Sequence, residues 1–156
     1  MRYERLVAVL LLTIAGSASP LYRGDRDAFK SGGAQQSTVT HSFISAEQLK
    51  AKLARNEAVN IIDVRSTDGY VNSKNKIKGA MYVKLRRLAY RLTMPPLKDI
   101  PRDRDIVTYC ACPHDEASIR AAEILLDAGF TRVHVLQGGW QMWVKANGQT
   151  EARPRG

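Results

Sequence analysis

Apolar and polar positions change period along the chain, and the changes predict short strands separated by helices. Strands are expected where β-rich apolar runs occur, at Val59–Val64, Ala80–Val83, Asp105–Tyr109 and Arg132–Leu136. The first of these runs is apolar on both faces, which is typical of a buried strand in a parallel sheet. The pattern therefore indicates an α/β fold with a mainly parallel sheet.

Helical signals lie before, between and after these strands. Helices are expected at Ser45–Asn56, Ala117–Ala128 and Trp140–Ala146. The first begins with a capping box, in which Ser45 caps the helix and Gln48 follows three residues later. The second consists of strong helix formers and is closed by a glycine.

The first 18 residues have the pattern of a secretory signal. Arg2 and Arg5 precede an apolar run at Leu6–Ala15, and small residues follow up to Ala18. This run is shorter than the roughly 20 residues that span a membrane comfortably. We expect export, to the bacterial periplasm, with cleavage after Ala18. If the segment is retained, it would anchor the chain to the inner membrane.

The remaining chain, within a total of 156 residues, has room for one ordinary domain. Residues 19–41 are rich in Gly, Ser, Gln and charged side chains and are expected to be a polar linker. The domain is expected over residues 42–150, and residues 151–156 are expected to be a disordered tail.

The formal net charge of +9 permits binding to nucleic acid or anionic surfaces but establishes neither. Aromatic residues are few and scattered, so no base-stacking platform is indicated and we expect no nucleic-acid partner. One stretch is enriched in basic side chains and is either a solvated face or a docking surface for an acidic protein partner. Its members are Lys74, Lys76, Lys78, Lys84, Arg86, Arg87 and Arg91.

The only two cysteines, Cys110 and Cys112, are one residue apart and cannot tie distant segments together. They stand between the end of a predicted strand and the start of a predicted helix. Sites in open α/β sheets form at this edge. Loop amides and the positive end of a helix stabilise a thiolate or a persulfide there, so the pair is a candidate for chemistry.

Four segments in this order resemble the rhodanese-like family. Ile62–Arg65 is similar to its Asp-x-Arg signature, and Lys76–Ala80 to its Gly-His-Ile-Pro-Gly-Ala segment. The cysteine loop followed by Ser118–Ala122 resembles the family's active-site loop and helix, and Leu136–Trp143 its Gly-Gly-Trp-x-x-Trp ending. The resemblance covers residues 42–149.

The resemblance implies a three-layer α/β fold with a five-stranded, mainly parallel sheet flanked by helices. It also implies transfer of sulfane sulfur through a cysteine persulfide on Cys112, from a small sulfur donor to a thiol or protein acceptor, without a cofactor. Asp63, Arg65 and Cys110 would support the site. The loop after the catalytic cysteine would comprise Pro113, His114, Asp115, Glu116, Ala117 and Ser118.

The loop departs from the pattern of members that use thiosulfate. Many of them carry Arg or Lys where this chain has Ala117, and this loop carries Asp115 and Glu116 instead. Negative charge near the cysteine would oppose a thiolate and repel a dianion, unless Glu116 points outward to stabilise the helix. Lys76 and Lys78 replace the family's usual His and Pro. A persulfide donor therefore fits as well as thiosulfate.

Three other interpretations remain open. Cys110, Cys112 and His114 could bind a soft metal such as Cu(I) or zinc, although the set lacks a fourth ligand. The two cysteines could instead exchange thiol and disulfide in an oxidising compartment. Within the sulfurtransferase interpretation, Cys110 could resolve the persulfide or protect Cys112 as a disulfide. The domain could also be catalytically silent and only bind a partner. Trp140 and Trp143 are expected to lie in the core.

Overall fold

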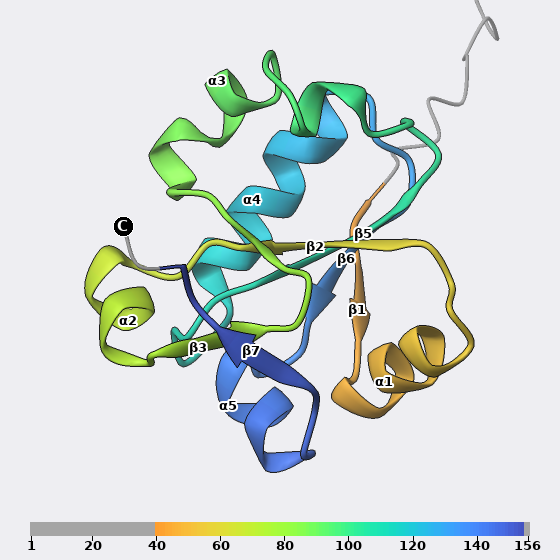
Figure 1. The fold of residues 1–156 in the computed structure, drawn as a ribbon. Helices are drawn as coiled ribbons and strands as arrows, with labels where there is room; N and C mark the ends of the chain where they lie inside the picture. Colours follow the sequence, from red (N-terminus) through yellow and green to blue (C-terminus); the bar gives the residue numbers. More distant parts are fainter. Residues whose placement is uncertain (1–39, 155–156) are drawn as a thin grey trace, which may run out of the picture. The chain divides into compact units, whose positions relative to one another are not determined.

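The computed structural model describes residues 40–154 (Figure 1). The expected signal segment, residues 1–18, lies outside this range, as does the expected linker, residues 19–41, except for its last two residues. Among the described residues, no helix combines the length and the apolar character needed to cross a membrane.

The central sheet has five strands in the order β1-β6-β5-β2-β4, and every neighbouring pair is parallel. Its strands are β1 (Ser42–Ile44), β2 (Val59–Asp63), β4 (Met81–Tyr82), β5 (Asp105–Tyr109) and β6 (Val133–Leu136). The expected α/β fold with a parallel five-stranded sheet is confirmed. The pattern of apolar residues did not reveal β1, which is three residues long and mostly exposed.

Helices cover both faces of this sheet (Figure 1). They are α1 (Ala46–Ala54), α2 (Thr67–Asn72), α3 (Leu88–Arg91), α4 (Glu116–Asp127) and α5 (Gly139–Lys145), with short 3-10 turns at η1 (Leu85–Arg87) and η2 (Leu97–Asp99). One core cluster joins the sheet to α3 and α4 around Ile106 and Leu125. The other joins it to α1 and α5 around Leu49 and Trp143. All five residues of β5 are buried, and the strand lies between β2 and β6, so its position in the sheet is well defined.

Local signals explain where the helices begin. The Ser45 side chain accepts a hydrogen bond from the Gln48 N–H at 3.1 Å, and the Ser45 N–H donates to Gln48 Oε1 at 2.8 Å. The capping box predicted for α1 is therefore present, and the helix ends at Ala54, two residues before the expected end. Helices α4 and α5 each begin one residue before the expected start.

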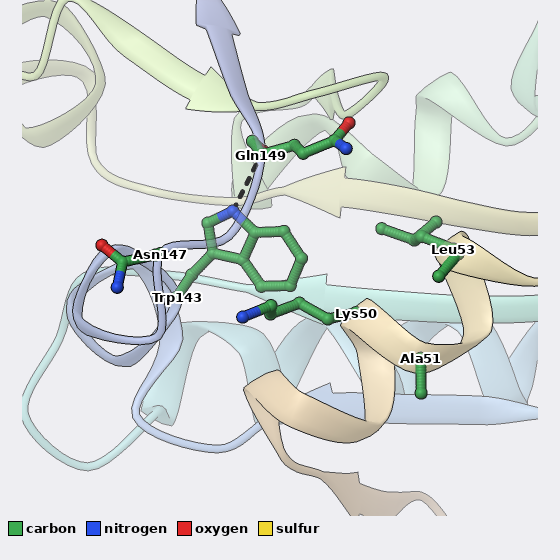
Figure 2. A pocket seen from close by; sticks show the side chains of 7 residues that line it. Lys50, Ala51, Leu53, Trp143, Asn147 and Gln149 are labelled. Atoms are coloured by element: carbon green, nitrogen blue, oxygen red, sulfur yellow. Dashed lines mark hydrogen bonds between the residues drawn. The ribbon is translucent and has the colours of Figure 1, made fainter.

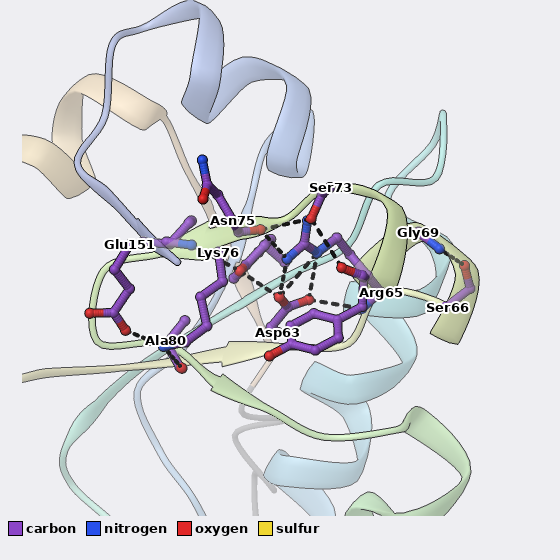
Figure 3. A network of polar contacts seen from close by, with 12 residues as sticks. Asp63, Arg65, Ser66, Gly69, Ser73, Asn75, Lys76, Ala80 and Glu151 are labelled. Carbon is purple, nitrogen blue, oxygen red and sulfur yellow. Dashed lines mark hydrogen bonds and ion pairs between the residues drawn. The ribbon is translucent and has the colours of Figure 1, made fainter. Parts of the chain in front are cut away.

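A second, two-stranded sheet extends the domain past the expected boundary at residue 150. β7 (Thr150–Ala152) pairs antiparallel with β3 (Asn75–Ile77). Lys76 is buried, forms an ion pair with Glu151 and donates to the Ala80 carbonyl at 2.7 Å (Figure 3). Residues 151 and 152 are thus not a disordered tail, and Lys76 does not belong to a solvated basic face.

Candidate active site

The two cysteines lie in the loop that joins β5 to α4, at the carboxyl edge of the parallel sheet. They are joined by a disulfide, so the structure holds the pair in its oxidised state. Cys110 is buried, with 1% of its surface exposed, whereas Cys112 is partly exposed. A reagent from solution can therefore reach Cys112 but not Cys110.

Each of the two sulfur atoms has at least one hydrogen-bond donor beside it. The Ala117 N–H, in the first turn of α4, points at Cys112 Sγ with a nitrogen–sulfur distance of 3.5 Å. Cys110 Sγ lies 3.3 Å from the Cys112 amide nitrogen and 3.5 Å from Ser118 Oγ, which is buried. Donors at the start of a helix stabilise negative charge on an atom placed there. The surroundings are thus suited to a thiolate or a persulfide.

The two acidic residues of the loop have different surroundings. Asp115 is buried in a left-handed backbone conformation with φ of 56°, and its Oδ2 accepts a hydrogen bond from the Gly138 N–H at 2.8 Å. Oδ2 is therefore tied to the backbone at the start of α5, whereas Oδ1 is buried without a hydrogen-bond partner among the described residues. Glu116 is exposed in the first turn of α4, where an acidic side chain favours the helix. The expected outward position of Glu116 agrees with this exposure.

The first residues of α5 hold the cysteine loop in place through two hydrogen bonds. The Trp140 N–H donates to the Cys110 carbonyl at 2.8 Å, and Gln141 Nε2 donates to the Ala111 carbonyl at 3.0 Å. A Cβ atom on Gly139 would overlap with the Cys110 carbonyl, so only glycine permits this approach. Sequence reasoning missed these contacts, although two adjacent glycines before a helix are a signal of close backbone contact.

Asp63 and Arg65 form a buried ion pair at the carboxyl end of β2 (Figure 3). Arg65 Nη2 and Nε donate to the Asp63 carboxylate at 2.6 and 3.0 Å. The same guanidinium donates to Ser73 Oγ at 2.7 Å and to the Asn75 carbonyl at 3.0 Å. Both side chains are fully buried, so the ion pair is shielded from solvent.

Tyr109 connects this pair to the cysteine loop. Its hydroxyl donates to Asp63 Oδ2 at 2.7 Å, and its carbonyl accepts from the Val64 N–H at 2.9 Å. Burial, together with the charge and the hydrogen bond of Asp63, raises the pKa of Tyr109, so its hydroxyl stays a donor. The Trp140 ring covers the Arg65 guanidinium at 4.5 Å. The network therefore fixes the residue directly before Cys110.

An open pocket of about 500 Å³ lies beside the loop and includes Ala117 in its wall. Lys84 and Arg86 are exposed at this pocket, and no acidic residue lines it. The hydroxyl oxygen of Tyr82 is buried there without a hydrogen-bond partner. The other lining residues are Val64, Arg65, Ser66, Thr67 and Leu85. Two exposed cations, Lys84 and Arg86, thus share this pocket with Ala117.

Another pocket, of about 390 Å³, lies between α1 and the segment that follows α5 (Figure 2). Lys50 and Leu53 line it from α1, and Trp143 and Gln149 from the other side. Trp143 is fully buried, as expected, and its indole N–H donates to the Gln149 carbonyl at 3.1 Å. None of the lining residues belongs to the cysteine loop, so this pocket has no direct access to the thiols.

The remaining loop residues do not form a metal site. Pro113 and His114 are exposed. Within residues 40–154, no group of three or more His, Cys, Asp or Glu side chains could hold a metal ion. His134 hydrogen-bonds to Ser42 at the edge of the sheet and lies 3.6 Å from Asp105. The candidate chemistry of the loop therefore rests on the two sulfur atoms.

Comparison with known proteins gives consistent matches to this domain. The family model described as rhodanese-like domain matches residues 45–146. A sulfurtransferase from Allochromatium vinosum is 29% identical over 102 residues, covering 65% of this chain and 87% of that protein. The thiosulfate sulfurtransferase GlpE from Shewanella oneidensis is 31% identical over 104 residues, covering 67% and 93%.

Solved structures agree. The crystal structure of the Alr3790 protein from Anabaena sp. superposes with a TM-score of 0.60 at 33% sequence identity, covering 70% of this chain and 82% of that one. The solution structure of a rhodanese-like domain from the same protein also has a TM-score of 0.60, at 31% identity. The family-model match, residues 45–146, includes the cysteine loop and the network of Asp63, Arg65 and Tyr109.

Proposed function

Because the chain belongs to the family of rhodanese-like domains, we propose that it is a sulfurtransferase that carries sulfane sulfur as a persulfide on Cys112. The contact between the Ala117 N–H and Cys112 Sγ carries this proposal. A donor in the first turn of a 12-residue helix stabilises both the thiolate that attacks and the persulfide that results. The relatives named sulfurtransferase support the same reaction class.

In the proposed reaction, the reduced Cys112 thiolate attacks the sulfane sulfur of a donor. A Cys112–sulfur bond forms, the bond between that sulfur and the rest of the donor breaks, and the donor leaves with the electron pair. With thiosulfate the leaving group is sulfite. A thiol acceptor then attacks the outer sulfur and releases the Cys112 thiolate.

The pocket beside Ala117 favours an anionic donor. Lys84 and Arg86 are exposed at this pocket and attract negative charge. Glu116 is exposed, so solvent screens its charge, and one oxygen of Asp115 accepts a hydrogen bond from the Gly138 N–H. Thiosulfate therefore joins anionic persulfides among the donors we propose.

Intact-mass spectrometry of the reduced full chain tests the proposal. The protein is incubated separately with thiosulfate and with glutathione persulfide, and wild type is compared with Cys112→Ser and Cys110→Ser. We expect Cys110→Ser to gain one sulfur, wild type to gain one sulfur at the shortest incubation, and Cys112→Ser to gain none. If no form gains sulfur, while wild type readily loses two hydrogens, the result supports thiol–disulfide exchange instead.

We also propose that the reaction takes place outside the cytoplasm, on the basis of Arg2, Arg5 and the apolar run at Leu6–Ala15. Expression of the full chain in a bacterium, followed by fractionation and N-terminal sequencing, tests this. We expect a periplasmic form that begins at Ser19. A chain with an intact N-terminus in the cytoplasmic fraction would contradict export.

A further inference from the structure

We propose that Cys110 attacks the persulfide on Cys112 and releases its outer sulfur as hydrogen sulfide. The domain would then have a second activity, thiol-dependent sulfide release, beside transfer of sulfur to an acceptor. This inference rests on the proposed function, because it begins from the Cys112 persulfide. It starts from the disulfide that joins the two cysteines.

The loop backbone allows the two sulfur atoms to bond to each other directly. In the disulfide, Cys110 Sγ contacts the Cys112 amide and the Ser118 hydroxyl, and Cys112 Sγ contacts the Ala117 N–H. The donors that favour negative charge on each sulfur are therefore in place in the product. Attack by Cys110 on Cys112 Sγ needs no group from outside the loop.

The difference in burial gives each sulfur a separate role. Cys110 is 1% exposed, so it is a poor target for a donor or an acceptor in solution. Cys112 is partly exposed and adjoins the residue that borders the basic pocket. An external acceptor can attack the outer sulfur of the persulfide, whereas Cys110 can attack only the inner sulfur, from within the protein.

The atoms and electrons of this step balance. The Cys110 sulfur forms a bond with Cys112 Sγ, the bond between Cys112 Sγ and the outer sulfur breaks, and the outer sulfur leaves with the electron pair. The proton of the Cys110 thiol accompanies it, which gives HS⁻. The two cysteine sulfurs are oxidised to the disulfide and the sulfane sulfur is reduced. An external thiol or dithiol then reduces the disulfide, through attack on the accessible Cys112.

The two thiols compete for one persulfide under different conditions. An external acceptor acts in proportion to its concentration, whereas Cys110 is held beside its target at a fixed effective concentration. At low acceptor concentration the internal route should dominate and leave the domain as the disulfide. At high acceptor concentration, transfer should dominate and the cysteines should stay reduced.

The experiment follows one turnover of the full chain. Reduced protein is loaded with sulfur from thiosulfate, freed rapidly from excess donor, and held without added thiol. Released sulfide is measured with a sulfide-selective electrode and the protein by intact mass. Cys110→Ser and Cys110→Ala are loaded in the same way, so that one variant remains interpretable if the other folds poorly.

We expect wild type to release its sulfur as sulfide and to end two hydrogens lighter than the reduced chain. Both Cys110 variants should gain one sulfur and keep it, with release at least roughly tenfold slower than wild type. Equal release from wild type and the variants, or a stable persulfide in wild type, would overturn the role of Cys110. If no form gains sulfur from thiosulfate or glutathione persulfide, the proposed function itself fails.

Discussion

The paired strands β2 and β5 have a buried aspartate at each end, Asp63 at the carboxyl end and Asp105 at the amino end, and the two are held in different ways. At the carboxyl end, Asp63 is paired with a single cation, Arg65, and accepts a hydrogen bond from Tyr109. At the amino end, Asp105 has Lys52 at 2.8 Å and Arg132 at 2.6 Å. The amino end thus has a second cation if one is lost, whereas the carboxyl end does not.

The two ends also differ in what surrounds them. The pocket at the amino end is lined by Glu57, Asp103 and Asp105 together with Arg104 and Arg132, so its charges are mixed. The pocket beside the cysteine loop has Lys84 and Arg86 at its surface and no acidic residue in its lining. The charged side chains that line this second pocket are thus all positive. The two ends thus differ both in how they hold a buried carboxylate and in the charge of the pocket beside them.

Replacing the single cation at the carboxyl end should have the largest effect. Arg65→Met leaves the Asp63 carboxylate buried without its partner, which should lower the free energy of unfolding by about 3–5 kcal/mol. Lys52→Met is the matched change at the other end. It should cost only about 1 kcal/mol, because Arg132 remains beside Asp105.

Denaturant unfolding measures both variants, and sulfur uptake by the folded fraction separates the roles of the two ends. We expect Lys52→Met to take up sulfur like wild type and Arg65→Met to take it up more slowly. Equal destabilisation by the two variants would show that a second cation does not matter.

Removing the Tyr109 hydroxyl should have the next largest effect. Tyr109→Phe deletes a hydrogen bond to a buried carboxylate, and hydrogen bonds to charged groups are worth about 1.5–3 kcal/mol. Tyr90→Phe is the control, because Tyr90 is 61% exposed. Thermal unfolding should show a clear loss for the first variant and almost none for the second. No difference between them would mean that the hydroxyl does not support the strand end.

The role of the pocket lined by Lys84 and Arg86 can be tested by measuring the KM for thiosulfate. Lys84→Gln combined with Arg86→Gln should raise the KM for thiosulfate roughly tenfold, because two partly exposed charge pairs together contribute on the order of 1.4 kcal/mol. The kcat should change little. The control, Lys98→Gln combined with Lys145→Gln, removes the same charge from exposed positions outside the pocket. An equal rise in KM in both double variants would indicate only a general effect of net charge.

The smallest expected effect is the contribution of Asp105, at the amino end of β5, to the pH dependence of the free energy of unfolding. Burial alone would raise the pKa of Asp105, but the hydrogen bond and charge of Lys52, with Arg132, lower it below its ordinary value of 3.8. The stabilisation is therefore present above the unfolded pKa and is lost as the pH falls through the folded pKa.

Urea unfolding of wild type and Asp105→Asn at several pH values checks this. The difference between them should be constant near neutral pH and shrink below pH 3.8. A difference that grows in acid would reverse the sign of the expected shift.

Local signals were sufficient for the parts of the fold that are dense in apolar residues. The β5 strand was predicted with its observed bounds, and the capping box at Ser45 is formed. β7 was missed because its three residues, Thr150–Ala152, have no apolar alternation and are held by pairing with β3 and the contact between Lys76 and Glu151. A partner about 75 positions away in the chain cannot be found from local pattern.

The sequence was sufficient to predict which loop carries the candidate site, but not the contacts that hold this loop. The position of Cys112 between a strand and a helix followed from periodicity and from the family resemblance. The contact of Gly139 and Trp140 with Cys110 joins segments about 30 residues apart, and the direction of the Asp115 carboxylate depends on its left-handed backbone. Charge counting along the loop therefore could not show which of its carboxylates is buried and which is exposed.

The most direct measurement is the location of the transferred sulfur. Trypsin should release residues 105–120 as one peptide that contains both cysteines, and fragmentation between them assigns an added sulfur to one or the other. Reduced protein loaded with donor and alkylated immediately should carry the sulfur on Cys112. A sulfur found on Cys110, or on neither cysteine, would contradict Cys112 as the sulfur carrier.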